Sequence, residues 1–253
     1  MISSNEKVPT IVNLPSIDRN DLSTLEKTQR HFYDIYNRRN SIHLNSLSSR
    51  IDLLDAGIGD FADSIQKGTN QEQYGQVLAR IVSRIFCVAN GVNNLSVEWG
   101  MRQKYPVEGC AYCLVIPCEC PEIRQKVNFD FGKNKEIQKT WSITQWQKHL
   151  DNLYGKKNRE KGINAVLNRL EKEKKELVKI EPMRQMGNYN NNQVEEEYAL
   201  ELADTMAWTM GAANILNINL LEAIKSRYGN GCKKCEEYEC VCGRHTLQSE
   251  KFY

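Results

Sequence analysis

The same cysteine spacing occurs twice in this chain, and this repeat constrains the fold more than any other feature. The segments CAYCLVIPCEC and CKKCEEYECVC both have the spacing C-x2-C-x4-C-x-C. Four thiolates so close together are typical of a tetrahedral zinc site, and four protein ligands leave no open position for a substrate. An iron–sulfur cluster is the alternative interpretation. We predict two structural Zn²⁺ ions per chain, bound by Cys110, Cys113, Cys118 and Cys120 and by Cys232, Cys235, Cys240 and Cys242.

The repeat extends upstream of each cysteine cluster. Residues 89–110 align with residues 212–232, and DIYNRRN resembles NLYGKKN. An internal repeat of this length indicates a duplicated structural unit. We predict two tandem units, at residues 20–122 and 141–245. A duplicated unit often packs as a pseudo-dimer that copies a two-fold interface, and a homodimer of the whole chain is a further assembly that this organisation allows.

Hydrophobic periodicity predicts an all-α fold. Apolar residues recur with helical period through residues 197–216, and strand-like alternation is almost absent from the sequence. Further helices are expected at residues 144–154, 163–181 and 217–228, and Pro182 is expected to end the second of these. Each unit is therefore predicted to be a bundle of four helices followed by its cysteine cluster.

Charge and hydropathy exclude several functions. The chain has 34 basic and 32 acidic residues among 253, whereas a dedicated nucleic-acid binder normally has a basic excess. No apolar run approaches the roughly 20 residues of a membrane span, and the first residues do not resemble a signal peptide. We therefore expect a cytoplasmic protein without membrane contacts, in which cysteines are more often metal ligands than disulfides.

Two pairs of carboxylates lie on consecutive predicted helices. Glu173 and Glu176 are three residues apart, as are Glu201 and Asp204, and this spacing places each pair on one helical face. The first pair lies in LEKEKKEL, where a solvated face with ion pairs is the alternative interpretation. The second lies in apolar ALELADTMAW, where buried carboxylates need a cation or strong hydrogen bonds. Together the four oxygen ligands suit Mg²⁺.

An ExxE helix followed by an ExxD helix resembles the MazG-type all-α nucleotide pyrophosphohydrolases, over about residues 154–228. The resemblance implies a four-helix unit that binds Mg²⁺ or Mn²⁺ and cleaves a nucleoside triphosphate to the monophosphate and pyrophosphate. It implies metal ligation for Glu173, Glu176, Glu201 and Asp204, and a role in orienting the attacking water for one of them or for a neighbouring glutamate. It also implies phosphate or product contacts for Lys225, Arg227 and Tyr228 in the segment KSRY.

Three questions stay open at this point. Trp208 lies one turn after Asp204, where it either contacts the nucleotide or packs in the core. The dimeric dUTPases are relatives of the same superfamily, so a dUTPase-like diphosphatase is an alternative function. A non-catalytic module that binds a nucleotide or a partner protein is another, although an intact carboxylate set favours an enzyme.

The first unit departs from the carboxylate pattern. In the repeat alignment Val77 and Arg80 stand opposite Glu201 and Asp204, and Gly57 stands opposite Glu173. We therefore predict that this unit does not hold the same metal site and acts as an inactive partner that completes the bundle.

The first unit also contains candidate functional residues of its own. Arg80 and Arg84 share one helical face, and we hypothesise that one of them reaches across the interface to the acidic cluster or to its triphosphate. An ion pair within the first unit is the alternative. Lys104 and Tyr105, in MRQKYP, match the tail of the second unit and are candidate functional residues, although solvated surface is the simpler interpretation for Lys104.

Overall fold

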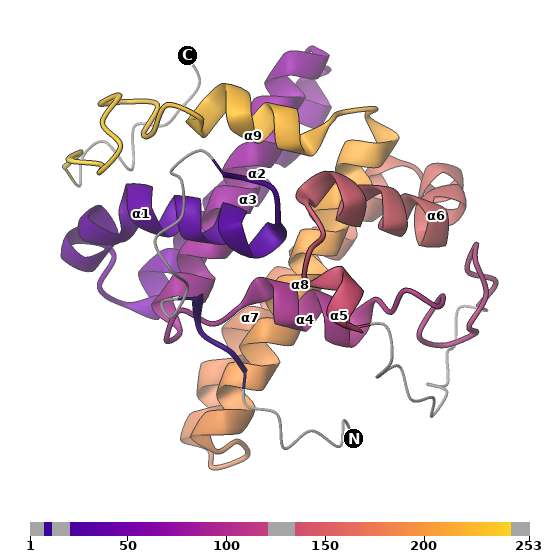
Figure 1. Ribbon diagram of the computed structural model, residues 1–253, viewed down its shortest axis with the longest axis horizontal. Coiled ribbons are helices and arrows are strands. Elements are labelled where there is room, and N and C mark those ends of the chain that lie inside the picture. Colours follow the sequence, from indigo (N-terminus) through magenta and orange to yellow (C-terminus); the bar gives the residue numbers. More distant parts are fainter. Residues whose placement is uncertain (1–7, 12–20, 121–134, 244–253) are drawn as a thin grey trace.

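The structure is a computed structural model that describes residues 8–11, 21–120 and 135–243 (Figure 1). In these ranges all regular elements are helices, and one isolated β-bridge joins Thr10 to Leu95. The predicted all-α fold is therefore confirmed for this part of the chain. None of its helices is long and apolar enough to cross a membrane. The predicted unit boundaries at residues 20, 122 and 245 lie outside the described residues.

Four helices form the described part of the first half of the chain. Each begins directly after a Ser, Thr or Asn whose side chain accepts a hydrogen bond from the backbone N–H three residues later. Such a cap satisfies one of the N–H groups that the first helical turn leaves without a partner. The helices are α1 (Leu25–His43), α2 (Leu47–Lys67), α3 (Gln71–Gly91) and α4 (Val97–Lys104).

The second half repeats this order after the short helix α5 (Lys135–Gln138). Its helices are α6 (Ile143–Lys161), α7 (Ile163–Gln185), α8 (Asn191–Ile215) and α9 (Leu220–Tyr228). The expectation that Pro182 ends the second of them is wrong, because α7 continues through Pro182 to Gln185. Val178 and Pro182 are both exposed there, so water can bind the carbonyl group that the proline leaves without its helical partner.

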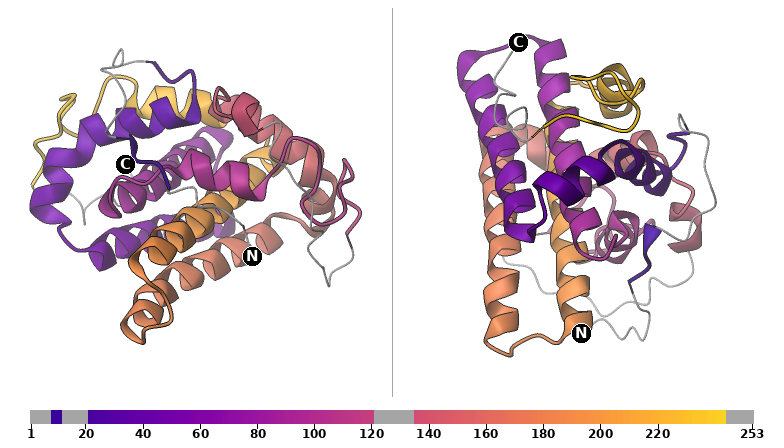
Figure 2. Two further views of the ribbon diagram at one scale, coloured as in Figure 1. Left: turned by 60° about the horizontal axis from the view of Figure 1, so that its bottom comes forward. Right: turned by 90° about the vertical axis from the view of Figure 1, so that its left-hand side faces the viewer.

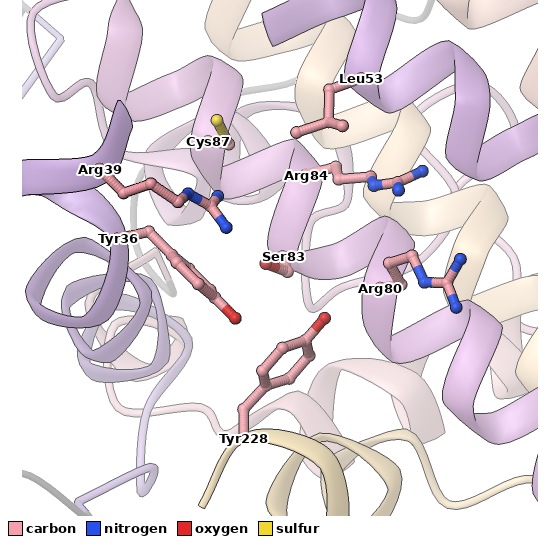
Figure 3. A pocket seen from close by; sticks show the side chains of 8 residues that line it. All are labelled: Tyr36, Arg39, Leu53, Arg80, Ser83, Arg84, Cys87 and Tyr228. Atoms are coloured by element: carbon pink, nitrogen blue, oxygen red, sulfur yellow. The ribbon is translucent and has the colours of Figure 1, made fainter. Parts of the chain in front are cut away.

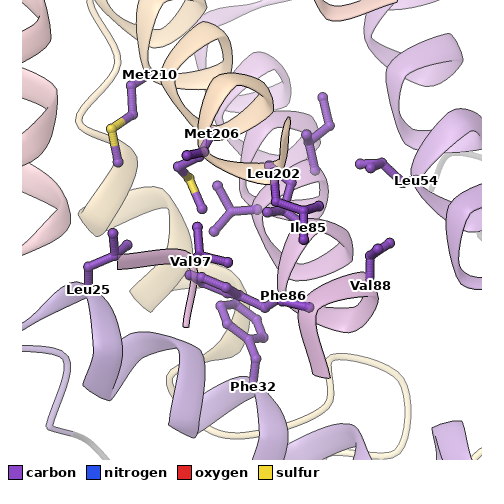
Figure 4. Packing of buried hydrophobic residues seen from close by; sticks show 14 of the residues in the cluster. Leu25, Phe32, Leu54, Ile85, Phe86, Val88, Val97, Leu202, Met206 and Met210 are labelled. Atoms are coloured by element: carbon purple, nitrogen blue, oxygen red, sulfur yellow. The ribbon is translucent and has the colours of Figure 1, made fainter. Parts of the chain in front are cut away.

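The two halves share one hydrophobic core. The central helix α3 is buried on most of its surface, and its neighbours include α1, α2, α8 and α9. Figure 4 shows Phe32 of α1 and Phe86 of α3 packed beside Val97 of α4 and Met206 of α8, all of them almost completely buried. Neither half therefore buries its apolar surface alone.

Contacts between the halves occur in matched pairs (Figure 2). Helix α4 packs on α8, whereas α9 packs on α3, and α2 lies beside α7. The Cys118 N–H donates to the Leu153 carbonyl of α6 at 2.8 Å, and the Cys240 N–H donates to the Ile35 carbonyl of α1 at 2.8 Å. Each half thus places its last helix and its cysteine cluster against the other half, as a two-fold relation between similar units would.

Candidate metal centre

Three of the four predicted carboxylates converge in the second half. Glu173 of α7 and Glu201 and Asp204 of α8 each offer one oxygen, and these oxygens lie within 4.8 Å of one another. The i, i+3 spacing on α8 places its two carboxylates on one face, and α7 packs directly against that helix. Glu173 is only 6% exposed. The arrangement offers a small, partly buried set of oxygen ligands to a cation.

Two of these carboxylates, Glu201 and Glu173, have raised pKa values. Burial raises the pKa of Glu201 to about 7, and the negative charges of Asp204 and Glu173 add to this effect, although Lys104 opposes it. Burial also raises the pKa of Glu173, again with a contribution from Asp204. Crowded anionic groups in a low-dielectric site are stabilised by a bound cation, because it offsets their repulsion.

Glu176, the fourth predicted ligand, lies outside this group of three. Its carboxylate pairs with Lys179 at 3.2 Å, and its side chain is 33% exposed. It remains on the helix that carries Glu173, one turn away. Trp208 is half-buried, and the guanidinium group of Arg169 lies over its ring at 5.9 Å from the centroid. A nucleotide contact from Trp208 stays a prediction.

Two residues of the first half complete the site. Lys104 Nζ donates a hydrogen bond to Asp204 Oδ2 and lies 3.7 Å from Glu201 Oε1. The Tyr105 hydroxyl donates to Asp204 Oδ1 at 2.5 Å. Burial would lower the pKa of Lys104, but Asp204 and Glu201 outweigh it and raise the pKa. Lys104 is therefore a charged component of the site and not solvated surface.

Gly100 permits the close approach of α4 to α8. A Cβ atom at Gly100 would overlap the Ala199 carbonyl oxygen of α8, so α4 can lie this close to α8 only without a side chain there. Lys104 follows Gly100 by four residues, which places it on the same face of α4. The close crossing of the two helices thus directs the end of α4 at Asp204.

The corresponding segment of the second half, KSRY, does not contact the three carboxylates in the same way. Lys225 pairs with Glu222 at 2.9 Å on α9. Arg227 Nη1 donates to Gln76 Oε1 of α3 at 3.0 Å, and Tyr228 lines a pocket of the first half. The structure therefore brings Lys104 and Tyr105, rather than this tail, to the three carboxylates. The repeat alignment pairs Tyr105 with Tyr228, but it does not show that the last helix of each half packs against the other half.

Arg80 and Arg84 contact a carboxylate of their own half. Arg80 Nη1 lies 2.6 Å from Asp60 Oδ2, and Arg84 Nη1 lies 3.9 Å from the same oxygen. The predicted contact of either arginine with a bound triphosphate stays a prediction.

Each cysteine cluster brings its four thiols together. In each, four sulfur atoms lie within 4.8 Å of one another, and two of the four cysteines are buried. The first cluster contacts α6, where Lys157 Nζ lies 3.6 Å from Cys118 Sγ. The second contacts α1, where the Tyr238 hydroxyl lies 2.9 Å from His31 Nδ1. The described residues contain two four-thiol sites that could hold metal and that also join the halves.

Comparison of the chain with family models, with curated proteins and with solved structures finds no match. The chemical interpretation of these sites therefore depends on their geometry and on the sequence motifs.

In the absence of Mg²⁺ and Mn²⁺ we expect Glu201→Gln to raise the free energy of unfolding by about 1 to 2 kcal/mol at pH 8. The pKa of about 7 in the folded protein lies above the ordinary value of 4.5. The folded state therefore binds this proton more tightly than the unfolded state, so ionised Glu201 is destabilising. This penalty is absent well below pH 4.5, grows as the pH rises to 7 and is complete above it.

Denaturant titrations at pH 5 and pH 8 measure this effect. The variant should gain stability over the wild type mainly at pH 8, where Lys104 still has Asp204 as its partner. A variant that is less stable than the wild type at pH 8 would show that ionised Glu201 stabilises the fold.

Proposed function

We propose that this protein is a Mg²⁺- or Mn²⁺-dependent nucleotide pyrophosphohydrolase that cleaves a nucleoside triphosphate to the monophosphate and pyrophosphate. The observation that carries the proposal is the convergence of Glu173, Glu201 and Asp204 within 4.8 Å, on two packed helices. Carboxylate oxygens are the ligands that these hard cations prefer. The ExxE and ExxD motifs supply the reaction class, through their resemblance to the MazG-type enzymes.

The residues of the chain fit a divalent cation. The pKa values of Glu201 and Glu173 are raised, so these carboxylates favour protons, which a bound cation would replace. Mg²⁺ bound to Glu173, Glu201 and Asp204 would offset phosphate charge and lower the pKa of a water molecule. Tyr105 fixes the orientation of Asp204 through its hydrogen bond.

The bond changes follow from the products. A water oxygen forms a bond to the α-phosphorus, the bond from that phosphorus to the bridging oxygen of the β-phosphate breaks, and pyrophosphate leaves with the electron pair. The proton of the water passes to a carboxylate, for which Glu176, one turn from Glu173 and outside the group of three, is a candidate. Lys104, which donates a hydrogen bond to Asp204, would exchange this partner for a phosphate oxygen, because an ammonium group binds either anion.

For the two cysteine clusters we propose structural Zn²⁺. Four thiolates match the closed tetrahedral coordination of a structural zinc site. Each cluster lies at a junction between the halves, so its metal would stabilise the arrangement that brings Lys104 to the carboxylates. In this proposal the first half is an inactive copy of a MazG-like unit that completes the site of the second.

Product analysis tests the proposed reaction. The purified protein is incubated with each common NTP and dNTP and with Mg²⁺, and the products are separated by ion-exchange chromatography. Monophosphate and pyrophosphate are expected in equal amounts, and a strict preference for dUTP would select the dUTPase-like alternative. Nucleoside diphosphate with orthophosphate would contradict the proposal, and the absence of turnover would favour a binding module.

We expect Lys104→Gln to raise the KM for the triphosphate by about tenfold or more at saturating Mg²⁺, because a charged hydrogen bond to phosphate contributes about 1.5 to 3 kcal/mol. The matched variant Arg227→Gln should change KM by less than about twofold, because Arg227 contacts Gln76 of α3. Steady-state kinetics of both variants measure the contrast. The reverse result would assign the phosphate contact to the tail of the second half.

A further inference from the structure

Two histidines occupy matched positions in the two halves. In the alignment of DIYNRRN with NLYGKKN, His31 of α1 stands opposite His149 of α6. His31 Nε2 lies 3.0 Å from the Tyr228 carbonyl oxygen, and His149 Nε2 lies 3.1 Å from the Pro106 carbonyl oxygen. A carbonyl oxygen only accepts hydrogen bonds, so Nε2 is the donor in both pairs. Each histidine therefore binds the chain where the last helix of the other half ends.

His149 is buried and fixed in its orientation. It is 8% exposed, and its ring packs edge-on against Trp141 and Trp146, with centroids 5.0 and 6.1 Å away. Burial lowers the pKa of His149, although the Pro106 and Tyr105 carbonyl groups oppose this effect. The ring is therefore neutral at neutral pH. A neutral ring packed against two indoles is a fixed hydrogen-bond donor for the chain that follows α4.

A second buried side chain holds the same turn. Gln138 Nε2 donates to the Tyr105 carbonyl oxygen at 2.7 Å, and Gln138 is 0% exposed. Carbonyl groups at the end of a helix have no helical partner, so donors there fix the direction in which the chain leaves. Lys104 is the last residue of α4 and Tyr105 is its cap, and both contact Asp204. Gln138 and His149 therefore bind the backbone beside the two side chains that reach the metal centre.

The matching contact of His31 lies away from the carboxylates. Tyr228, whose carbonyl group His31 binds, lines a pocket together with Arg80 and Arg84 (Figure 3). Within the described part of the chain, the lining of this pocket contains no Asp or Glu. Loss of the His31 hydrogen bond should therefore loosen the end of α9 without disturbing Asp204. The repeat thus contains a matched control for His149.

We propose that His149 is a positioning residue of the metal centre. By binding the chain at the end of α4, it holds the side chains of Lys104 and Tyr105 against Asp204. Pro106 directly follows Tyr105, so the histidine acts one peptide bond away from the residue whose hydroxyl donates to Asp204. Only the kinetic consequence rests on the proposed function, in which Lys104 binds a phosphate. The contact of Tyr105 with Asp204 can be tested without any substrate.

A double-mutant cycle of melting temperatures, measured without added Mg²⁺ or Mn²⁺, tests this role directly. Tyr105→Phe removes the hydroxyl donor to Asp204 and should lower the melting temperature of the wild type by about 2 °C or more. In a His149→Leu background the same change should lower it by less than about half as much, because Tyr105 no longer lies against Asp204. In a His31→Leu background the change should have its full effect.

Steady-state kinetics with a nucleoside triphosphate and saturating Mg²⁺ test the consequence for the reaction. His149→Leu should raise KM by about fivefold or more, and by a larger factor than it lowers kcat. Because His149 acts through Lys104, adding His149→Leu to Lys104→Gln should change KM by less than about twofold. His149→Gln, whose amide group can donate to the same carbonyl oxygen, should keep the KM of the wild type. His31→Leu should keep it as well.

These outcomes separate the role of His149 from the proposed function. Absence of turnover in the wild type would contradict the proposed function, and the melting temperatures would still decide the role of His149. An effect of Tyr105→Phe that is equal in the wild type and in His149→Leu, including no effect in either, would overturn the proposal. So would an unchanged KM in His149→Leu, or an equal rise in His31→Leu. If His149→Leu does not fold, Gln138→Met, which removes the donor to the Tyr105 carbonyl group, carries both comparisons.

Discussion

Asp204→Asn is expected to reduce triphosphate turnover by about a thousandfold or more, while the variant keeps the helical content and oligomeric state of the wild type. Asp204 contacts Lys104 and Tyr105 of the first half and belongs to the group of three carboxylates. The replacement removes one oxygen ligand without a change of side-chain size. It also removes the negative charge that holds Lys104 and Tyr105 in place. Turnover and Mn²⁺ affinity should therefore fall together.

Glu171→Gln is the matched control for this experiment. Glu171 lies on α7, two residues before Glu173, and pairs with Lys174 at 3.0 Å. The variant removes an equal charge from the same helix but leaves the three carboxylates intact. Turnover near the wild-type level is expected for Glu171→Gln, measured with saturating Mg²⁺. An Asp204→Asn variant that retains wild-type turnover would place the chemistry elsewhere.

Cys232→Ser should remove one of two zinc ions and lower the free energy of unfolding by about 3 kcal/mol or more, because metal binding at a structural site contributes directly to folding. The second cluster holds α1 through the hydrogen bond from Cys240 to Ile35 and through the contact of Tyr238 with His31. Loss of the cluster near one end of the chain should therefore loosen a helix near the other end.

Hydrogen exchange and elemental analysis measure this effect. Cys232→Ser should speed amide exchange in α1, whereas Cys110→Ser should speed it in α6, because the first cluster contacts that helix. Cys87→Ser is the control, since Cys87 belongs to neither cluster, and it should retain two zinc ions. Exchange that rises only in the helices next to the mutated cluster in sequence would contradict the crossed arrangement of the halves.

Local patterns predicted the elements of this fold well. Apolar periodicity indicated the helices of the second half, and the cysteine spacing indicated two sets of four sulfur atoms that the structure brings together. The spacing of Glu201 and Asp204 likewise placed them on one face. These features depend on residues close together in the chain, where helix geometry or a short loop decides the outcome.

Features that depend on contacts between the halves were not predictable from spacing. Lys104 lies 100 residues from Asp204 in the chain, and only the crossing of α4 over α8 brings them together. Within α7, Glu176 stays a predicted ligand: it pairs with Lys179 at 3.2 Å and lies outside the group of three carboxylates. A motif shows which side chains share a face but not how the facing helix is rotated against it.

A crystal structure with Mn²⁺ and a triphosphate analogue that carries a methylene group between the α- and β-phosphorus atoms tests the central claim most directly. An anomalous peak of manganese is expected between Glu173, Glu201 and Asp204, within about 2.3 Å of at least two carboxylate oxygens, with Lys104 in contact with a phosphate. A manganese peak elsewhere, or an analogue bound away from these carboxylates, would contradict the proposed active site.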